Sequence, residues 1–251
     1  MEQEERMDHS LEGKAVLVTG ASSGIGEATA LALSKAGARV AVGARRTERL
    51  AGIASRASGE VLTLELDVTD EQSCRAAVAA TVERFGGLDV LVNNAGLMLS
   101  GPILGADTTE WTRMVRTNLL GSMYTAHAAL PHLLERRGTL VQTSSTSGRT
   151  ASAGGGVYSA TKFGINAFSE ALRKEVTAQG VRVVVIEPGF VATELASHIT
   201  DPSMRAVAQD MMSSIRTLEP EDVANAVLYA VSQPDHVAVN EILLRPTDQT
   251  V

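Results

Sequence analysis

The two residues whose types and spacing most clearly suggest proton-transfer chemistry are Tyr158 and Lys162, four positions apart in the segment VYSATKFG (157–164). Four residues is just over one helical turn, so in a helix both side chains lie on the same face. A free tyrosine titrates near ~10 and a free lysine near ~10.4, so neither exchanges protons readily at neutral pH. An ammonium group beside a phenol favours the phenolate, which would let the tyrosine act as a general acid or base. Two unrelated neighbours on a helix surface would leave the same short pattern, so other residues must support this interpretation.

A glycine-rich turn follows the first β-rich run of the chain. The run AVLVT (15–19) leads into TGASSGIGEATA, which contains Gly20, Gly24 and Gly26. Glycine permits a tight turn and close approach of a pyrophosphate, and free N–H groups at the next helix N-terminus favour phosphate. The spacing GxxxGxG is a variant of the commoner GxGxxG fingerprint, and an ordinary strand–helix turn is the alternative. Its place between a strand and a helix favours a dinucleotide site.

The end of the second β-rich run indicates which dinucleotide binds. The run continues as VAVGARRTERL, with Ala44 at the position where an NAD site usually carries an acid for the ribose. Arg45 and Arg46 follow, and guanidinium groups suit a 2′-phosphate through charge-assisted hydrogen bonds. The two arginines could instead only solvate a helix start. The absence of an acidic residue at position 44 and the presence of Arg45 and Arg46 together favour NADP over NAD.

Later runs also end in polar or turn-forming residues. Asp67 ends the third run, where it could reach an adenine amino group, and NNAG (93–96) ends the fourth with small residues beside the cofactor. TSSTSG (143–148) ends the fifth with hydroxyls that we expect to point into the crevice. The sixth run is broken by Pro188 and Gly189, and Thr193 beyond them could bond a carboxamide.

Alternating strands and helices must position these residues. Seven strands are expected at 15–19, 39–43, 61–66, 89–93, 139–144, 181–187 and 241–245. Helices are expected at 24–36, 71–85, 108–136, 158–178 and 220–232. Runs nearly continuous in Val, Ile and Leu are typical of strands covered on both faces, and the alternation predicts a doubly wound, seven-stranded parallel sheet in one α/β domain. Ligands bind such sheets beyond the carboxyl ends of the strands, where the polar residues gather.

Composition excludes several other classes of protein. The chain has 251 residues, a net charge of −7 and no basic stretch longer than isolated pairs, so no nucleic-acid partner is expected. No apolar run approaches the ~20 residues of a membrane span. The single cysteine, Cys74, points to a reducing compartment. The segment 1–10 is polar and unlike an apolar signal segment, and it is expected to be a flexible arm. A cytoplasmic protein is therefore predicted. The five histidines show no ligand spacing, so no metal site is expected.

These motifs together resemble the short-chain dehydrogenase/reductase family over roughly residues 11–245. TGASSGIG, NNAG, the Asn of RTNLLG, Ser145, YSATK and PG occur in the family's order, and Ser145 precedes Tyr158 by thirteen residues. The stretches DTTEWTRM, SHIT and RPTDQ are most similar to clavulanate-forming aldehyde reductases, and NADP-dependent 3-hydroxy-acid dehydrogenases are also similar. The fold implied by this resemblance is the Rossmann fold.

The resemblance implies a role for each of four residues. Tyr158 is the catalytic acid/base, Lys162 lowers its pKa and bonds the nicotinamide ribose, and Ser145 anchors the substrate oxygen. Asn118 is the fourth member and would hold a water through which Lys162 is reprotonated. Substrate contacts are expected from Ser145, Tyr158 and Phe190. The cofactor contacts implied are Gly20, Ser22, Ser23, Gly24, Ile25, Gly26, Ala44, Arg45, Arg46, Asp67, Val68, Asn94, Ala95, Gly96, Thr117, Tyr158, Lys162, Pro188, Gly189, Val191 and Thr193.

The segments around the crevice are expected to select substrate and partner. Residues 194–216 resemble the family's substrate lid, and an adaptable apolar pocket is expected from Met98, Leu99, Phe190, Met204, Met211 and Met212. The helix at 108–136 carries more apolar surface than one stripe needs, which favours a homotetramer or homodimer over a helix thickly buried within one subunit.

The resulting hypothesis is a reversible NADPH-dependent reductase of an aldehyde or ketone of a small or medium-sized metabolite, and the resemblance implies a secondary-metabolite pathway. Two alternatives stay open. One is an NAD-dependent sugar or steroid alcohol dehydrogenase, against which Ala44 argues. The other is a catalytically silent dinucleotide sensor, against which the intact set of four catalytic residues argues.

Overall fold

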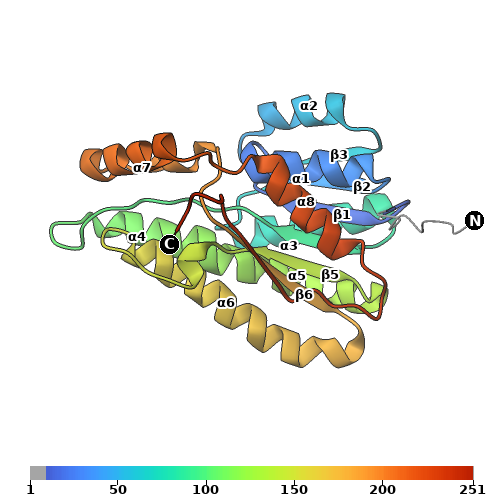
Figure 1. Ribbon diagram of the computed structural model, residues 1–251. Coiled ribbons are helices and arrows are strands. Elements are labelled where there is room, and N and C mark those ends of the chain that lie inside the picture. The colour runs from blue at the N-terminus through green and yellow to red at the C-terminus, as the bar shows by residue number, and fades with distance from the viewer. Residues whose placement is uncertain (1–9, 251) are drawn as a thin grey trace, which may run out of the picture.

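A seven-stranded parallel sheet forms the centre of the computed structural model, which describes residues 10–250 (Figure 1). The strands are β1 (Ala15–Thr19), β2 (Arg39–Ala44), β3 (Val61–Glu65), β4 (Val90–Asn93), β5 (Thr139–Thr143), β6 (Arg182–Pro188) and β7 (Glu241–Leu244). Their order is β3-β2-β1-β4-β5-β6-β7, and every neighbouring pair is parallel. The expected doubly wound Rossmann fold is therefore confirmed. The strand order reverses between β1 and β4, which places the ligand crevice at their carboxyl ends.

Helices cover both faces of the sheet. They are α1 (Gly24–Lys35), α2 (Thr47–Arg56), α3 (Glu71–Phe85), α4 (Thr108–Met114), α5 (Gly121–Arg136), α6 (Gly156–Val176), α7 (Pro202–Ser214) and α8 (Pro220–Val231). In Figure 1, α1 and α8 lie on one face of the sheet, while α3, α5 and α6 lie on the other. The lid expected at 194–216 contains a short 3-10 helix (Glu194–His198) followed by α7.

The apolar strands pack against both helical layers. Val16 and Val18 of β1 belong to the core cluster that includes α1 and α8, whereas Leu17 belongs to the cluster on the opposite face. All three side chains are completely buried. Successive side chains of a strand point to opposite faces, so a strand covered on both sides needs an uninterrupted apolar run.

The expected single helix at 108–136 is interrupted. A π-helical turn, Val115–Leu120, separates α4 from α5 and contains Asn118. Such a turn places one extra residue in an otherwise regular helix and occurs frequently at functional sites. The apolar pattern of the sequence continues through it, which is why the pattern alone predicted one helix.

The flexible arm expected at 1–10 lies, apart from Ser10, outside the described residues. Among the helices between residues 10 and 250, none has both the length and the apolar character needed to cross a bilayer.

Candidate active site

A cavity of about 950 Å³ opens at the carboxyl ends of β1, β4, β5 and β6. Three of the four expected catalytic residues line it, namely Ser145, Tyr158 and Lys162. The predicted cofactor contacts line it too, with Gly26 as the exception. One continuous cavity is therefore lined by both the candidate catalytic residues and the candidate cofactor-binding residues.

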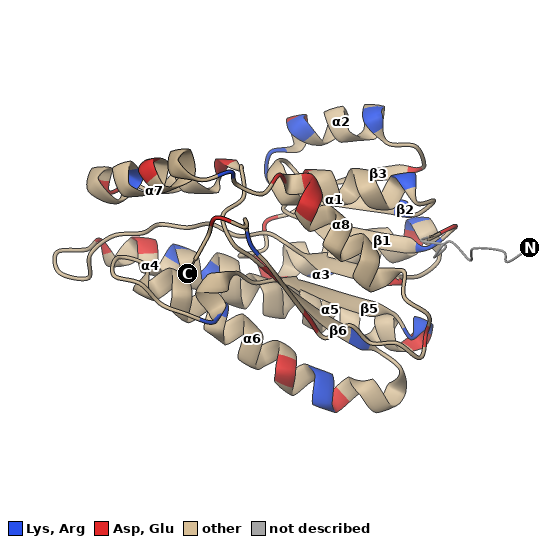
Figure 2. Cartoon of the chain, viewed as in Figure 1, with Lys and Arg blue, Asp and Glu red and all other residues tan. Residues whose placement is uncertain are grey.

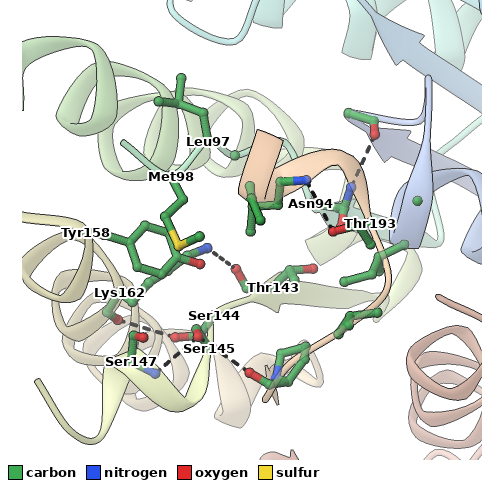
Figure 3. Close-up of a pocket in the computed structure, with 18 of the residues that line it drawn as sticks. Asn94, Leu97, Met98, Thr143, Ser144, Ser145, Ser147, Tyr158, Lys162 and Thr193 are labelled. Atoms are coloured by element: carbon green, nitrogen blue, oxygen red, sulfur yellow. Dashed lines mark hydrogen bonds between the residues drawn. The ribbon is translucent and has the colours of Figure 1, made fainter. Parts of the chain in front are cut away.

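Ser145, Tyr158 and Lys162 converge from two neighbouring elements (Figure 3). Ser145 follows β5, and its Oγ accepts from the Ser147 amide at 3.1 Å and lies 3.4 Å from the Pro188 carbonyl. Tyr158 and Lys162 come from the first two turns of α6, and both side chains are buried. The Lys162 Nζ donates to the Thr143 carbonyl at 2.8 Å and lies 5.6 Å from the centre of the Tyr158 ring.

The electrostatics of this pair differ from the sequence expectation. Burial raises the pKa of Tyr158 to about 12, and the hydrogen bond from Ser145 acts in the opposite direction. Burial also lowers the pKa of Lys162 to about 8. The expected lowering of the phenol pKa by the ammonium is therefore wrong, since the pKa of Tyr158 is raised. The Lys162 ammonium is held by the Thr143 carbonyl, so desolvation determines the pKa of each group.

Asn118 lies behind the cavity, outside its lining, and fixes the loop after β4. Its Oδ1 accepts from the Leu97 amide at 2.8 Å, and its Nδ2 donates to the Leu97 carbonyl at 2.9 Å. Nδ2 also lies 3.2 Å from Thr161 Oγ1 on α6. The side chain thus ties the 94–97 loop to the helix that carries Tyr158. The water-holding role implied for Asn118 stays a prediction.

The glycine-rich turn fits a dinucleotide. Gly20 has φ of +64°, and a Cβ there would stand 2.6 Å from the Ala95 Cα. A Cβ on Gly26 would stand 2.4 Å from the Gly20 carbonyl oxygen. Asn94 holds the turn from the neighbouring strand, because its Nδ2 donates to the Thr19 and Gly20 carbonyls at 3.3 and 3.2 Å. The glycines at 20 and 26 therefore let the turn pack closely against the loop after β4, and Gly20 and Gly24 line the cavity where a pyrophosphate would bind.

A cluster of arginines lies at the end of β2. Arg46 donates to Ser22 Oγ at 3.1 Å and to Ser23 Oγ at 3.0 Å, both in the glycine-rich turn. Ala44 is buried and presents no acid. Arg46 and Arg49 also pair with Glu194 of the lid. Sequence reasoning missed Arg49 and Glu194; the position of Arg49 three residues after Arg46 on a helix was an available signal, whereas nothing marked Glu194.

An ion pair with a buried carboxylate supports the loop that carries Ser145, and sequence reasoning missed it as well. Arg149 donates to both carboxylate oxygens of Glu187, at 2.7 and 2.8 Å, and also pairs with Glu241. Glu187 is completely buried on β6, and Asn166 of α6 donates to it at 2.7 Å. The network therefore joins the loop after β5 to β6, β7 and α6.

The apolar pocket is confirmed in part. Met98, Phe190, Met211 and Met212 line the cavity. Leu99 is instead buried in a cluster with Met114 and Tyr158 behind the cavity. Met204 packs toward Gly154, where its Cε lies 2.6 Å from the position of a Cβ. Between residues 10 and 250, no group of three or more His, Cys, Asp or Glu side chains is arranged to hold a metal ion.

Comparisons with known proteins place this site in a family. The family profile described as short chain dehydrogenase matches residues 14–203. An uncharacterized oxidoreductase of Staphylococcus aureus is 40% identical over 238 residues, which cover 94% of this chain and 98% of that protein. The chain belongs to the short-chain dehydrogenase/reductase family. It is therefore an oxidoreductase of a family that binds nicotinamide dinucleotides.

Two more similar proteins are a reductase and an alcohol dehydrogenase. Glycine betaine reductase ATRR of Emericella nidulans is 42% identical over 246 residues, covering 96% of this chain but only 19% of that protein. The chain thus spans about a fifth of that relative's length. The structure of an alcohol dehydrogenase from Thermococcus sibiricus, complexed with 5-hydroxy-NADP, superimposes with a TM-score of 0.84 at 31% identity. That match covers 95% of this chain and 98% of the other.

Proposed function

We propose that the protein is an NADPH-dependent reductase of an aldehyde or ketone of a small or medium-sized metabolite, working reversibly. The observation that carries this proposal is the convergence of Ser145, Tyr158 and Lys162 in a cavity that continues into the glycine-rich turn. A carbonyl reduction needs a hydride on carbon and a proton on oxygen. When bound, the reduced nicotinamide supplies the hydride, and the chain supplies the rest.

The protonation state of the site suits reduction. With a pKa of about 12, the Tyr158 phenol keeps its proton near neutral pH and can donate it to the developing alkoxide. The Ser145 hydroxyl, close to that phenol, can donate a hydrogen bond to the same oxygen and stabilise its charge. Lys162, with its pKa lowered to about 8 by burial, can exchange a proton near neutral pH.

NADP is supported by the end of β2. Arg46 lies against both serines of the glycine-rich turn, Arg45 lines the same cavity, and the acid expected for NAD is absent at Ala44. The Thermococcus sibiricus neighbour was solved with an NADP derivative.

Two kinetic measurements test this function. The purified protein should oxidise NADPH with members of a panel of aldehydes and ketones, and NADH should serve less well. Replacing both Arg45 and Arg46 with alanine should raise the KM for NADPH and scarcely change that for NADH. Exchanging the exposed Arg75 and Arg84 of α3 for alanine removes the same charge elsewhere and is the matched control. Equal or better use of NADH by the native protein would favour the NAD-dependent alternative, and no turnover across the panel would favour the silent sensor.

A symmetric homotetramer, or a homodimer, and a cytoplasmic location are also proposed. Exposed apolar side chains lie on two separate surfaces, with Val115 and Phe163 near α6 and Tyr229 on α8. Closed symmetric assembly would cover both surfaces. The lone cysteine, Cys74, is buried, as suits a reducing compartment.

A further inference from the structure

The lid places a carboxylate between two arginines at the adenosine end of the cavity. Glu194 Oε2 lies 2.9 Å from Arg46 Nη1, and Glu194 Oε1 lies 2.8 Å from Arg49 Nη1. In Figure 2 basic residues mark both ends of α2, and the chain that leads into α7 passes close to the first of them. An acidic side chain of the lid therefore binds to basic side chains of the nucleotide half.

The donors that hold Glu194 are those that a phosphate would need. Arg46 reaches the hydroxyls of Ser22 and Ser23 with one nitrogen and Glu194 with another. Arg49 has no other acidic partner among the described side chains. Guanidinium groups bind carboxylates and phosphates through the same forked geometry. The Glu194 carboxylate and a 2′-phosphate would thus bind the same guanidinium groups, those of Arg46 and Arg49.

The carboxylate is charged at any working pH, and it can be displaced. The two arginines lower the pKa of Glu194 to about 2. The side chains of Arg46, Arg49 and Glu194 are 39%, 43% and 44% exposed, so water screens each pair. Exposed ion pairs contribute little each, whereas a phosphate brings more charge and more acceptor oxygens.

The same contact fixes the entrance of the lid. Thr193 precedes Glu194 and packs on the glycine-rich turn, where its Cγ2 stands 3.0 Å from the position of a Cβ on Gly24. Beyond Glu194, the lid continues into α7 and the methionines of the substrate pocket. Displacement of Glu194 would therefore remove the ion-pair anchor at the start of the lid, whereas the hydrogen bond from the Ala192 amide to the Leu218 carbonyl would remain.

We infer that Glu194 is a specificity-determining residue that competes with the cofactor's 2′-phosphate for Arg46 and Arg49. The competition lowers the affinity for a 2′-phosphorylated nucleotide, leaves the affinity for its unphosphorylated counterpart unchanged, and couples phosphate binding to release of the lid entrance. The inference rests on the proposed binding of NADP at this cleft.

Calorimetric titration with 2′,5′-ADP and with 5′-ADP tests the competition without any substrate. In Glu194→Gln, we expect 2′,5′-ADP to bind roughly threefold to tenfold more tightly than in the native protein, as loss of two exposed pairs implies. We expect 5′-ADP to bind within about twofold. Glu48→Gln is the matched control, because Glu48 lies exposed on the same helix as Arg49 and forms no ion pair among the described residues. It should change neither affinity by more than about twofold.

The outcomes separate this inference from the proposed function. Unchanged or weaker binding of 2′,5′-ADP by Glu194→Gln overturns the inference, while a native preference for 2′,5′-ADP would still support NADP. If Glu194→Gln binds 2′,5′-ADP more tightly than the native protein, but the native protein binds 2′,5′-ADP and 5′-ADP equally well, the inference is supported and the NADP proposal is overturned. An equal gain in Glu48→Gln also overturns the inference, because the effect would then be one of net charge.

Hydrogen exchange provides the second readout. Addition of 2′,5′-ADP to the native protein should speed amide exchange in residues 194–198, and 5′-ADP should not. In Glu194→Gln these amides should exchange faster from the start and respond little to either nucleotide. Slower exchange in 194–198 on adding 2′,5′-ADP to the native protein would contradict release of the lid entrance.

Discussion

Removing the cation of the buried pair between Arg149 and Glu187 should destabilise the protein more than neutralising the anion. Arg149→Ala leaves a completely buried carboxylate with Asn166 as its remaining side-chain donor among the described residues. Breaking a buried ion pair in this way costs about 3–5 kcal/mol. Glu187→Gln keeps the shape and one acceptor, and the Arg149 side chain, 44% exposed, retains Glu241 and water. Loss of charge-assisted hydrogen bonds there should cost about 1–3 kcal/mol.

Thermal unfolding followed by circular dichroism measures the difference. For a chain of this size, each kcal/mol lowers Tm by about 2–4 °C, so Arg149→Ala should lose roughly 10 °C and Glu187→Gln about half of that. Adding Glu187→Leu to Arg149→Ala should restore part of the loss, because the unpaired buried charge is removed. A Glu187→Gln variant less stable than Arg149→Ala, or a double variant less stable than either, would refute this account of the network.

Four further outcomes are expected. Tyr158→Phe should lower kcat about 100- to 10,000-fold, because only the proton donor is lost, while the Kd for NADPH stays within about twofold; a rate near native would mean that the proton comes from another group. Stability should rise between pH 8 and 10, because Lys162 has a pKa of about 8 when folded and the unfolded chain binds more protons over this range. The rise in the free energy of unfolding, measured with urea, should reach up to roughly 3 kcal/mol, and Lys162→Met should flatten it. An unchanged dependence of that free energy on pH in Lys162→Met would argue against the buried lysine as its source. Above pH 10 the raised pKa of Tyr158 acts in the opposite direction, so stability should fall as the unfolded phenol ionises. Light scattering at micromolar concentration should show an oligomer, and a tetramer is expected. A monomer would contradict the assembly inferred from the exposed side chains of Val115 and Phe163.

Features set by local sequence were predictable. Buried strands show continuous apolar runs, and the residues that follow them must gather at one edge of a parallel sheet, which brought Ser145, Asn94 and Gly20 to the same cavity. The helical spacing of Tyr158 and Lys162 likewise placed both side chains at the site.

Features set by contacts between distant segments were not predictable from the sequence. Arg46 and Glu194 are separated by 148 positions, and Arg149 and Glu187 by 38, so only the folded chain shows that they pair. The pKa of Tyr158 also depends on burial and on the engagement of Lys162 by the Thr143 carbonyl, neither of which the spacing of the two residues reveals.

The π-helical turn at Val115–Leu120 limits where the length of this chain can change. Adding one more residue there would exceed what the turn already accommodates, and it would rotate one flank of the helix against the other by about 100°. Met114 on one flank and Thr125 and Ala129 on the other are all buried, so one set would leave its packing site. The nearby loop at 102–106 has no such restriction, since Leu104 is 95% exposed. Naturally occurring or designed length variants should therefore carry insertions within 102–106 and none within 115–120.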